Sequence, residues 1–359
     1  MVSKKREEEL KKLGVILYIV GASLLSLWCV RIFIAPVAPS FPSATESPKL
    51  KIIFAGDVMM HTPQLLKARK NNGYDFNSCF RYVKPYFKAA DIAVVNLETT
   101  LSETPPYTGY PLFCSPAEVA TALANAGVDV AITSNNHALD MGVKGLESTI
   151  DILAKNAILS TGTFRDSADY KSRNPLIIDR NGLKIAILAY TYSTNGIPIP
   201  DNVKINLLDT LQMKSDISRC KDVDCTIAYL HWGDEYSERI SRAQQKIAAT
   251  LHRAGCQVII GSHPHVVQGA EISMREVTVY SLGNFISNQR VIGSDGGIMA
   301  ELEIVKDSLG CQFWLNIIPI WVRKSDYTIL PQSVGDTLHL SEEERATYRL
   351  FLKNCSRLF

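Results

Sequence analysis

Seven short apolar runs recur along the chain from Lys49 onward, and each run ends in a cluster of polar residues. The runs and their polar ends are KIIFA–GDVMMH, IAVV–NLETT, VDVAIT–SNNHALD, LKIAILA–YTYSTNG, CTIAYL–HWGDE, CQVII–GSHPHVVQG and VTVY–SLGNFISNQ. Continuous hydrophobicity over so few residues is typical of strands buried on both faces. Helical patterns lie between several of these strands, at 115–127, 142–156 and 237–255. Strands that alternate with helices predict an α/β fold.

The C-terminal part of the chain has a different pattern. Residues 297–305 and 311–322 have the composition of two strands joined by the short turn KDSLG, and we expect them to add antiparallel strands to one sheet edge. Residues 341–354 form an amphipathic pattern that opens on Ser341 with Glu344 three residues later, which indicates a helix start. We therefore predict one domain over residues 49–359.

An uncharged segment of 18 residues, Leu13–Val30, precedes this domain. Its length suits a transmembrane helix, and the basic residues before it favour a cytoplasmic N-terminus. We therefore predict a cytoplasmic tail at 1–12, a transmembrane signal anchor at 13–34 in the cell membrane, a Pro/Ser-rich linker at 35–48 and an extracytoplasmic domain. A cleaved signal peptide and a buried helix are the alternative interpretations.

Charge and cysteine content argue against two kinds of site. The first twelve residues carry five Lys or Arg and three Glu, which accounts for the whole formal net charge of +2. The rest of the chain is neutral, whereas a nucleic-acid partner requires a basic surface. The eight cysteines form no CxxC pattern, so they do not indicate a thiolate zinc site, and the sequence leaves their pairing open.

The polar clusters place residues of metal-ligand type at one edge of the predicted sheet, because ligands of open α/β sheets bind outside the carboxyl ends of the strands. Those ends carry Asp57, His61, Asn96, Glu98, Asn136, His137, His231, Asp234, Glu235, His263 and His265. Taken singly, each has an ordinary structural explanation, such as an Asx turn at Asp57 or a loop carboxylate at Asp234 or Glu235. Their shared location favours a metal site.

The types and number of these ligands indicate which metals to expect. Imidazoles and carboxylates without thiolates suit Mn²⁺, Zn²⁺ or Fe. There are more candidate ligands than one ion needs, so we expect two divalent ions that share a carboxylate. Such a pair clamps a phosphoryl group or a related oxyanion and activates water near neutral pH.

The polar clusters resemble the signature blocks of the CapA family, which are bacterial capsule and poly-γ-glutamate synthesis proteins. The blocks are, in chain order, GDVMMH, NLETTL, SNNHALDMG, HWGDEY, GSHPHVVQG and YSLGNFISNQ. The resemblance covers about residues 49–288. It implies the fold of the calcineurin-like metallophosphoesterases, which is a four-layer sandwich of two mixed β-sheets flanked by helices, with a dinuclear metal centre.

The resemblance also implies roles for individual residues. Glu98 stands at the position of the bridging carboxylate, and His137 stands where the family places an acid or charge stabiliser. Pro264 limits the backbone freedom of the His-x-His pair, whose two imidazoles would each bind one ion. The implied metal ligands are Asp57, His61, Glu98, Asn136, His231, His263 and His265.

This sequence departs from the phosphoesterase pattern at three places. His61 follows Asp57 by four residues, where the usual pattern is Asp-x-His. The bridging residue is Glu98 where an Asp is usual, and Asn135 replaces the usual Gly before the Asn-His pair. These differences are compatible with metal binding but depart from an ordinary phosphoesterase site.

A second set of polar residues lies at the same end of the sheet, in YTYSTNG and SLGNFISNQR. Turn formation is one explanation for them. The other is recognition of an anionic substrate, with Arg290 as the partner of a carboxylate or phosphate. The candidates for substrate binding are Tyr192, Thr194, Asn195, Asn284, Asn288 and Arg290.

Two functions from different classes follow from this interpretation. The first is an anchored hydrolase of envelope-polymer synthesis, which cleaves a phosphoester or a γ-glutamyl amide with His137 as the proton donor. The second is a non-catalytic subunit that binds an anionic polymer through its metal site, together with other capsule synthesis proteins. Metal content and product release distinguish the two.

Overall fold

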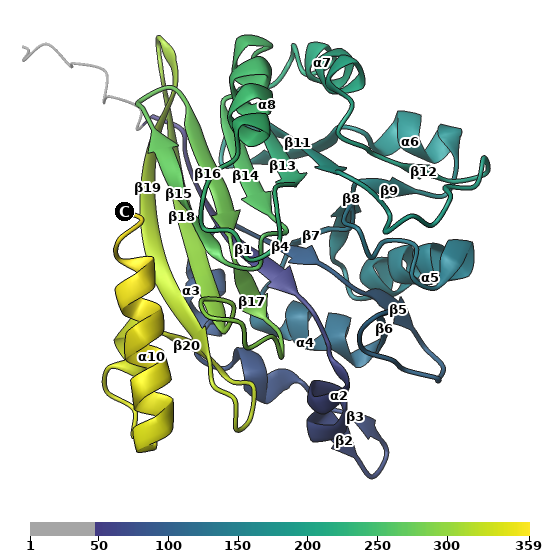
Figure 1. Cartoon of the computed structure of the whole chain (residues 1–359). Coiled ribbons are helices and arrows are strands. Elements are labelled where there is room, and N and C mark those ends of the chain that lie inside the picture. Colours follow the sequence, from purple (N-terminus) through teal and green to yellow (C-terminus); the bar gives the residue numbers. More distant parts are fainter. Residues whose placement is uncertain (1–46) are drawn as a thin grey trace, which may run out of the picture. The chain divides into compact units, whose positions relative to one another are not determined.

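Two mixed β-sheets pack face to face in the part of the chain that the structure describes, which is residues 47–359 of a computed structural model (Figure 1). The first sheet has the order β20-β19-β18-β1-β4-β7-β8, with β17 beside the end of β1. In it, β1 runs parallel to β4 and antiparallel to β18. Its strands are β1 Lys49–Val58, β4 Ile92–Leu97, β7 Val130–Ile132, β8 Leu159–Thr161, β17 Asn284–Ile286, β18 Gly296–Asp307, β19 Gly310–Val322 and β20 Ile329–Pro331.

The second sheet has six strands in the order β10-β11-β13-β14-β16-β15. The four central strands are parallel to one another, and the two edge strands are antiparallel to their neighbours. The strands are β10 Leu176–Arg180, β11 Leu183–Thr191, β13 Cys225–His231, β14 Val258–Ser262, β15 Val267–Ile272 and β16 Val277–Leu282.

Helices cover the outer faces of both sheets, so the domain has four layers (Figure 1). The first sheet is covered by α2 Thr62–Ala68, η1 Asn77–Phe80, α3 Lys84–Ala89, α4 Glu118–Ala126 and α5 Gly142–Lys155. The second is covered by α7 Thr210–Ser218 and α8 Arg242–Arg253. The C-terminal helix α10, Glu342–Cys355, packs beside β19 (Figure 1). The predicted α/β fold with two mixed sheets is therefore confirmed.

Smaller elements decorate the loops between these layers. Three two-stranded sheets pair β2 with β3, β5 with β6, and β9 with β12. Their bounds are β2 Arg69–Lys70, β3 Gly73–Tyr74, β5 Thr100–Ser102, β6 Cys114–Pro116, β9 Thr163–Phe164 and β12 Lys204–Ile205, and two short helices are α6 Ser167–Arg173 and α9 Gln332–Gly335.

Strand β1 shows why the central strands are apolar on both faces. Leu50, Ile52 and Phe54 pack in the core between the two sheets, whereas Ile53 and Ala55 pack against the helices of the first layer. All five side chains are 0% exposed. Alternate residues of a strand point to opposite faces, so a strand between two packed layers needs apolar residues at every position.

A glycine lets β1 pass close to the turn before β17. A Cβ atom on Gly56 would lie 1.9 Å from the carbonyl oxygen of Gly283, so no other residue fits there without displacement of the backbone. The next residue, Asp57, donates its backbone N–H to that same carbonyl at 3.2 Å and pairs with Asn284. The close approach therefore fixes where Asp57 emerges from the sheet.

The structure corrects one predicted helix boundary. The pattern at 237–255 predicts a helix from Ser237, but α8 begins at Arg242. Ser241 caps it by accepting a hydrogen bond from the backbone of Gln244, whose side chain accepts one from the Ser241 N–H. This reciprocal cap satisfies two otherwise unpaired N–H groups. The predicted hairpin lies at the sheet edge as expected, with β20 added outside it.

The predicted cytoplasmic tail and signal anchor, at 1–12 and 13–34, lie outside the described residues, as does most of the predicted linker. Within residues 47–359 there is no helix with the length and apolar character needed to cross a bilayer. The seven cysteines of the described residues are buried and form no disulfide.

Candidate metal centre

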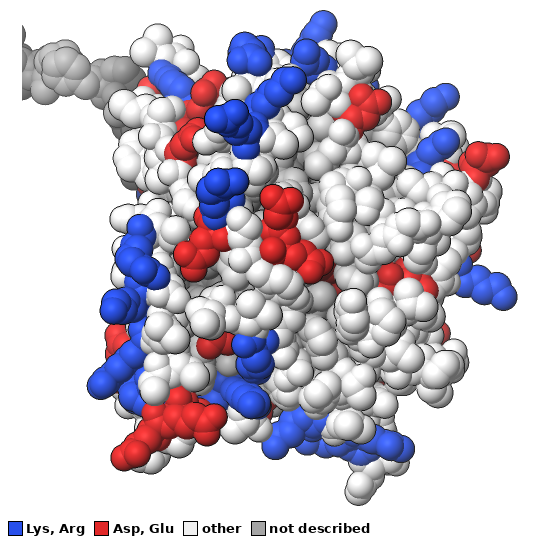
Figure 2. Space-filling model, viewed as in Figure 1, with Lys and Arg blue, Asp and Glu red and all other residues white. Residues whose placement is uncertain are grey.

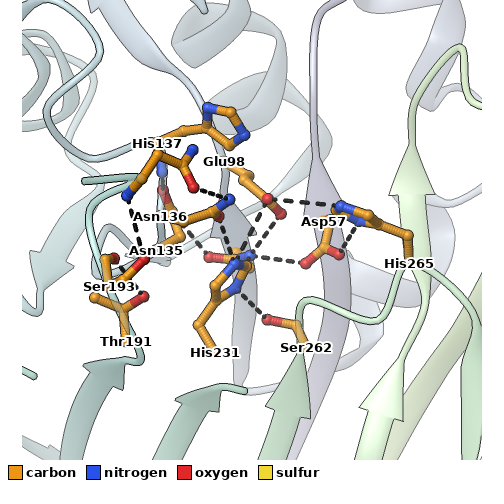
Figure 3. Close-up of polar contacts among 12 residues, drawn as sticks. Asp57, Glu98, Asn135, Asn136, His137, Thr191, Ser193, His231, Ser262 and His265 are labelled. Carbon is orange, nitrogen blue, oxygen red and sulfur yellow. Dashed lines mark hydrogen bonds and ion pairs between the residues drawn. The ribbon is translucent and has the colours of Figure 1, made fainter. Parts of the chain in front are cut away.

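Side chains from the ends of five strands converge in one buried place, and none of them is more than 3% exposed (Figure 3). They are Asp57 of β1, Glu98 after β4, Asn136 after β7, His231 of β13, and His263 and His265 after β14. Because parallel strands of both sheets end here, residues far apart in the sequence become neighbours. Six of the seven predicted metal ligands are thus brought together, and His61 is not among them.

Two buried triads have the geometry of metal sites. Glu98, His231 and His263 form one triad, and Asp57, Glu98 and His265 form the other. Within each triad the candidate ligand atoms lie within 4.8 Å of one another. Glu98 belongs to both triads, so it occupies the position that a bridging carboxylate requires.

Hydrogen bonds to neighbouring residues orient the ligands of both triads (Figure 3). The Oδ1 atom of Asn136 lies 2.8 Å from Nε2 of His231, and the Ser262 hydroxyl lies 3.2 Å from Nδ1 of the same ring. On the other side, Nδ1 of His265 lies 2.9 Å from Oδ2 of Asp57. Such contacts fix the orientation of each ring.

Two ligand atoms in this cluster are buried without a hydrogen-bond partner, namely Oε1 of Glu98 and Nδ1 of His263. An unpaired buried polar atom costs roughly 1–3 kcal/mol, so their persistence needs a reason. A cation between them would satisfy both atoms at once, and the imidazole and carboxylate donors suit a divalent metal. The residues present therefore fit a divalent metal ion.

The protonation of the two histidines fits a cation, whereas Glu98 must release a proton when it binds one. Burial raises the pKa of the Glu98 carboxyl well above its usual value, and the Asp57 carboxylate adds to the rise. Burial likewise lowers the pKa of His231 well below its usual value and that of His263 to about 3. Both histidines are therefore neutral near pH 7, which is the form that binds metals.

His137 lies beside these triads and belongs to neither of them. Its Nδ1 atom is 2.7 Å from Oδ2 of Asp140, which also accepts the backbone N–H of Phe113 at 2.6 Å. The Phe113 ring meets the imidazole edge to face at 4.7 Å. With Nδ1 held by a carboxylate, Nε2 is the ring nitrogen left for proton transfer.

The predicted ligand role of His61 does not fit its position. His61 belongs to no metal-type group among residues 47–359. It is the N-cap of α2, its backbone N–H donates to Gln64, and its Nδ1 accepts the backbone N–H of Asn288 at 3.3 Å. The longer spacing after Asp57 places the ring outside both triads, where its Nδ1 atom accepts the Asn288 N–H.

The predicted substrate-binding residues occupy two kinds of position. The Tyr192 ring lies 4.4 Å from the His263 ring, and Asn195 accepts a hydrogen bond from Asn136 at 3.1 Å, so both border the centre. The Thr194 hydroxyl donates to the carbonyl of Ile197, so that group serves its own loop.

The other predicted substrate-binding residues belong to β17 and the loop that follows it. Asn284 is fully buried and donates to Gln289 and to the carbonyl of Ser294, which holds this loop in place. Asn288 accepts a hydrogen bond from the Tyr327 hydroxyl at 2.8 Å. Arg290 lines a groove of about 570 Å³ between this loop and α10.

Comparison with known families identifies the chain. The family described as Bacterial capsule synthesis protein PGA_cap matches residues 51–289, which is more than half of its length. The chain belongs to this family.

Individual relatives agree with this assignment. The chain is 24% identical to the capsule biosynthesis protein CapA of Bacillus anthracis, over 99% of this chain and 85% of the relative. It is 26% identical to the PGA biosynthesis protein CapA of Bacillus subtilis, over 78% of this chain and 76% of the relative.

A solved structure shares the fold of this PGA_cap domain. A 5'-nucleotidase precursor from Thermus thermophilus superposes with a TM-score of 0.50 at 13% identity. The match covers 86% of this chain but only 59% of the nucleotidase, so the nucleotidase is considerably longer. A likeness at this identity establishes the fold alone.

Two asparagines that are not among the predicted metal ligands organise this PGA_cap centre. Asn96 donates to Oδ1 of Asp57 at 2.7 Å. Asn135, which replaces the usual Gly, donates to Oδ1 of Asn96 at 3.2 Å and accepts the backbone N–H of His137. They therefore tie the end of β7 to the ends of β1 and β4. The sequence signal for them was their position in the polar clusters NLETT and SNNHALD, beside the predicted ligands.

We expect the metal-free protein to lose stability as the pH falls below 6.5. The pKa values of His231 and His263 in the folded state lie below the ordinary value of 6.5, so the unfolded chain takes up protons first. Their stabilising contribution is therefore complete above pH 6.5 and declines toward the folded pKa. Glu98 opposes this, because its raised pKa keeps a proton on the folded state. Burial also lowers the pKa of His61 to about 4, so three imidazoles contribute and the net loss is about 2 kcal/mol between pH 6 and pH 5.

Urea denaturation in the presence of a chelator at pH 7, 6 and 5 measures this slope. His263→Asn is expected to flatten it, because one of the three titrating imidazoles is removed. An unfolding free energy that is constant from pH 7 to pH 5 would contradict this expectation, because the Glu98 proton offsets only one imidazole.

Proposed function

We propose that this chain is a membrane-anchored, extracytoplasmic hydrolase of capsule or poly-γ-glutamate synthesis, with a dinuclear divalent metal centre. The observation that carries the proposal is the sharing of Glu98 between two buried triads. Asp57, Glu98 and His265 would hold one ion, and Glu98, Asn136, His231 and His263 would hold the other. Mn²⁺, Zn²⁺ and Fe²⁺ suit this donor set.

The anchor in this proposal is the segment at 13–34, which begins with the uncharged stretch Leu13–Val30 and which basic residues precede. Membership in a capsule synthesis family supports a location at the cell surface, where such a polymer is handled. The polymer chemistry also supports a metal site, because a polyanion needs a cationic contact.

The chemistry assigns distinct tasks to the residues of the centre. Two divalent ions would polarise a phosphoryl or carbonyl oxygen and activate water. Asp140 holds Nδ1 of His137, which fixes the orientation of the ring. His137 would then give the proton on Nε2 to the leaving group. Tyr192, whose ring lies against the His263 ring, would exclude water from one side.

Arg290 supports a second candidate function, the binding of an anionic polymer without cleavage. Its Nε and Nη2 atoms are buried without partners, and its Nη1 atom donates to the carbonyl of Gln289. A guanidinium with unpaired N–H groups favours a carboxylate or phosphate ligand. The groove that Arg290 lines would then hold part of the bound polymer.

Product release from the full-length protein in detergent tests the proposal. We expect metal-dependent release of phosphate from simple phosphoesters, or shortening of poly-γ-glutamate, with loss of both after chelation. If the metal-loaded protein retains the polymer but cleaves no substrate, the binding function replaces the hydrolase.

A further inference from the structure

Glu235 lies in a loop that is fixed against the two histidines after β14. The loop follows β13, and Gly233 turns it with a φ of 91°, which is a conformation that favours glycine. Tyr236 has a φ of 60° and donates its backbone N–H to the carbonyl of Pro264 at 2.8 Å. The residue between the two histidines is thus hydrogen-bonded to the residue next to Glu235.

This arrangement brings the Glu235 carboxylate to the metal ligands. A carboxylate oxygen of Glu235 and one nitrogen each of His263 and His265 lie within 4.8 Å of one another. Both histidines are buried, whereas Glu235 is exposed. The carboxylate therefore reaches the imidazoles from the solvent side, whereas Glu98 is buried.

The backbone of the two histidines is strained in a way that serves this geometry. His263 has a φ of 99° and His265 a φ of 58°, which are rare values for residues other than glycine. Such conformations cost roughly 1–3 kcal/mol each and persist where the surroundings enforce them. Here they turn two imidazoles of one segment toward the same small space.

We propose that Glu235 is an additional ligand of a divalent cation at this centre, placed on its solvent side between His263 and His265. The inference rests on the proposed metal centre and adds a ligand to it. An exposed carboxylate would complete the coordination of ions whose other ligands are buried. Figure 2 shows acidic side chains near the middle of one face of the molecule, with Lys and Arg side chains beside them.

The neighbouring residue provides a matched control. Asp234 carries the same charge one position earlier in the loop and belongs to no metal-type group within the described residues. A general effect of negative charge on metal affinity would be similar at Asp234 and Glu235. Direct ligation would appear at Glu235 alone.

The experiment measures Mn²⁺ and Zn²⁺ affinity of the full-length protein in detergent by competition with a chromogenic chelator. We expect Glu235→Gln to lower the affinity for at least one of these ions by about 10-fold or more. The variant should also lose that ion faster to excess chelator. We expect Asp234→Asn to change the affinity less than about 2-fold, since it removes the charge without removing a ligand. Glu235→Asp keeps the charge with a shorter reach and is expected to fall between the two.

The outcomes separate this inference from the proposed function. If the parent and Glu235→Gln bind the same ions with equal affinity, Glu235 is not a ligand and the centre stands without it. Equal weakening by Glu235→Gln and Asp234→Asn would also overturn the inference, because it would indicate a charge effect. If the parent protein binds neither metal, the proposed centre fails and the ligand role fails with it.

Discussion

Replacement of Glu98 by Gln is expected to remove both metal ions from the protein. Glu98 is common to the two buried triads, so loss of its negative charge weakens both sites at once. The Gln side chain has nearly the same shape, and burial already favours the uncharged form of Glu98. The substitution should therefore leave the metal-free fold intact. Elemental analysis after gel filtration from metal-replete buffer should give two ions for the parent and none for Glu98→Gln.

Single-triad variants sharpen this experiment. Asp57→Asn affects one triad only and His231→Gln affects the other only, so each variant is expected to keep one ion. Glu103→Gln is the matched control, because Glu103 is exposed, pairs with Lys155 and belongs to no metal-type group of the described chain. If Glu98→Gln keeps two ions, Glu98 does not bridge them. If every variant keeps one ion, the centre is mononuclear.

The sequence predicted the central strands well because their surroundings are uniform. The IIFA part of KIIFA and the IAYL part of CTIAYL are apolar at each position, since β1 and β13 lie between two packed layers. The edge strands were not predicted. In β10 all five residues are at least partly exposed and the last two are charged, and β15 carries a Gly and a Glu, so neither shows a long continuous apolar run. These two strands form because they pair with β11 and β16, and their own sequences do not show that pairing.

The same contrast explains the site. Asp57, Glu98 and His231 were predicted because a strand end fixes where its last side chains lie. Glu235 was interpreted as a loop carboxylate because its position depends on a hydrogen bond between Tyr236 and Pro264, which lie in separate segments. Sequence spacing cannot report such a contact. His61 shows the opposite error, since it was predicted as a metal ligand from its spacing after Asp57. In the structure it is instead the N-cap residue of α2.

Substitution of His137 by Gln is expected to lower the rate of hydrolysis about 10²–10⁴-fold, as removal of a general acid does. His137 belongs to no metal-type triad in the part of the chain that the structure describes, so we expect metal content to stay at the parent value. Polymer binding should also persist. Single-turnover release of product from the metal-loaded full-length protein measures the rate. Asp140→Asn is expected to cause a smaller loss, because the imidazole remains but loses the carboxylate that orients Nδ1.

The control for His137 is His339→Gln, which removes an exposed imidazole and should hydrolyse at the parent rate. Cleavage by His137→Gln at the parent rate would mean that the leaving group takes its proton from another source. A bell-shaped pH profile that loses its alkaline limb in His137→Gln would identify this ring as the acid, since an acid must be protonated to act. If neither the parent nor the variant cleaves any substrate while both bind the polymer, the His137–Asp140 pair positions a ligand instead of a proton.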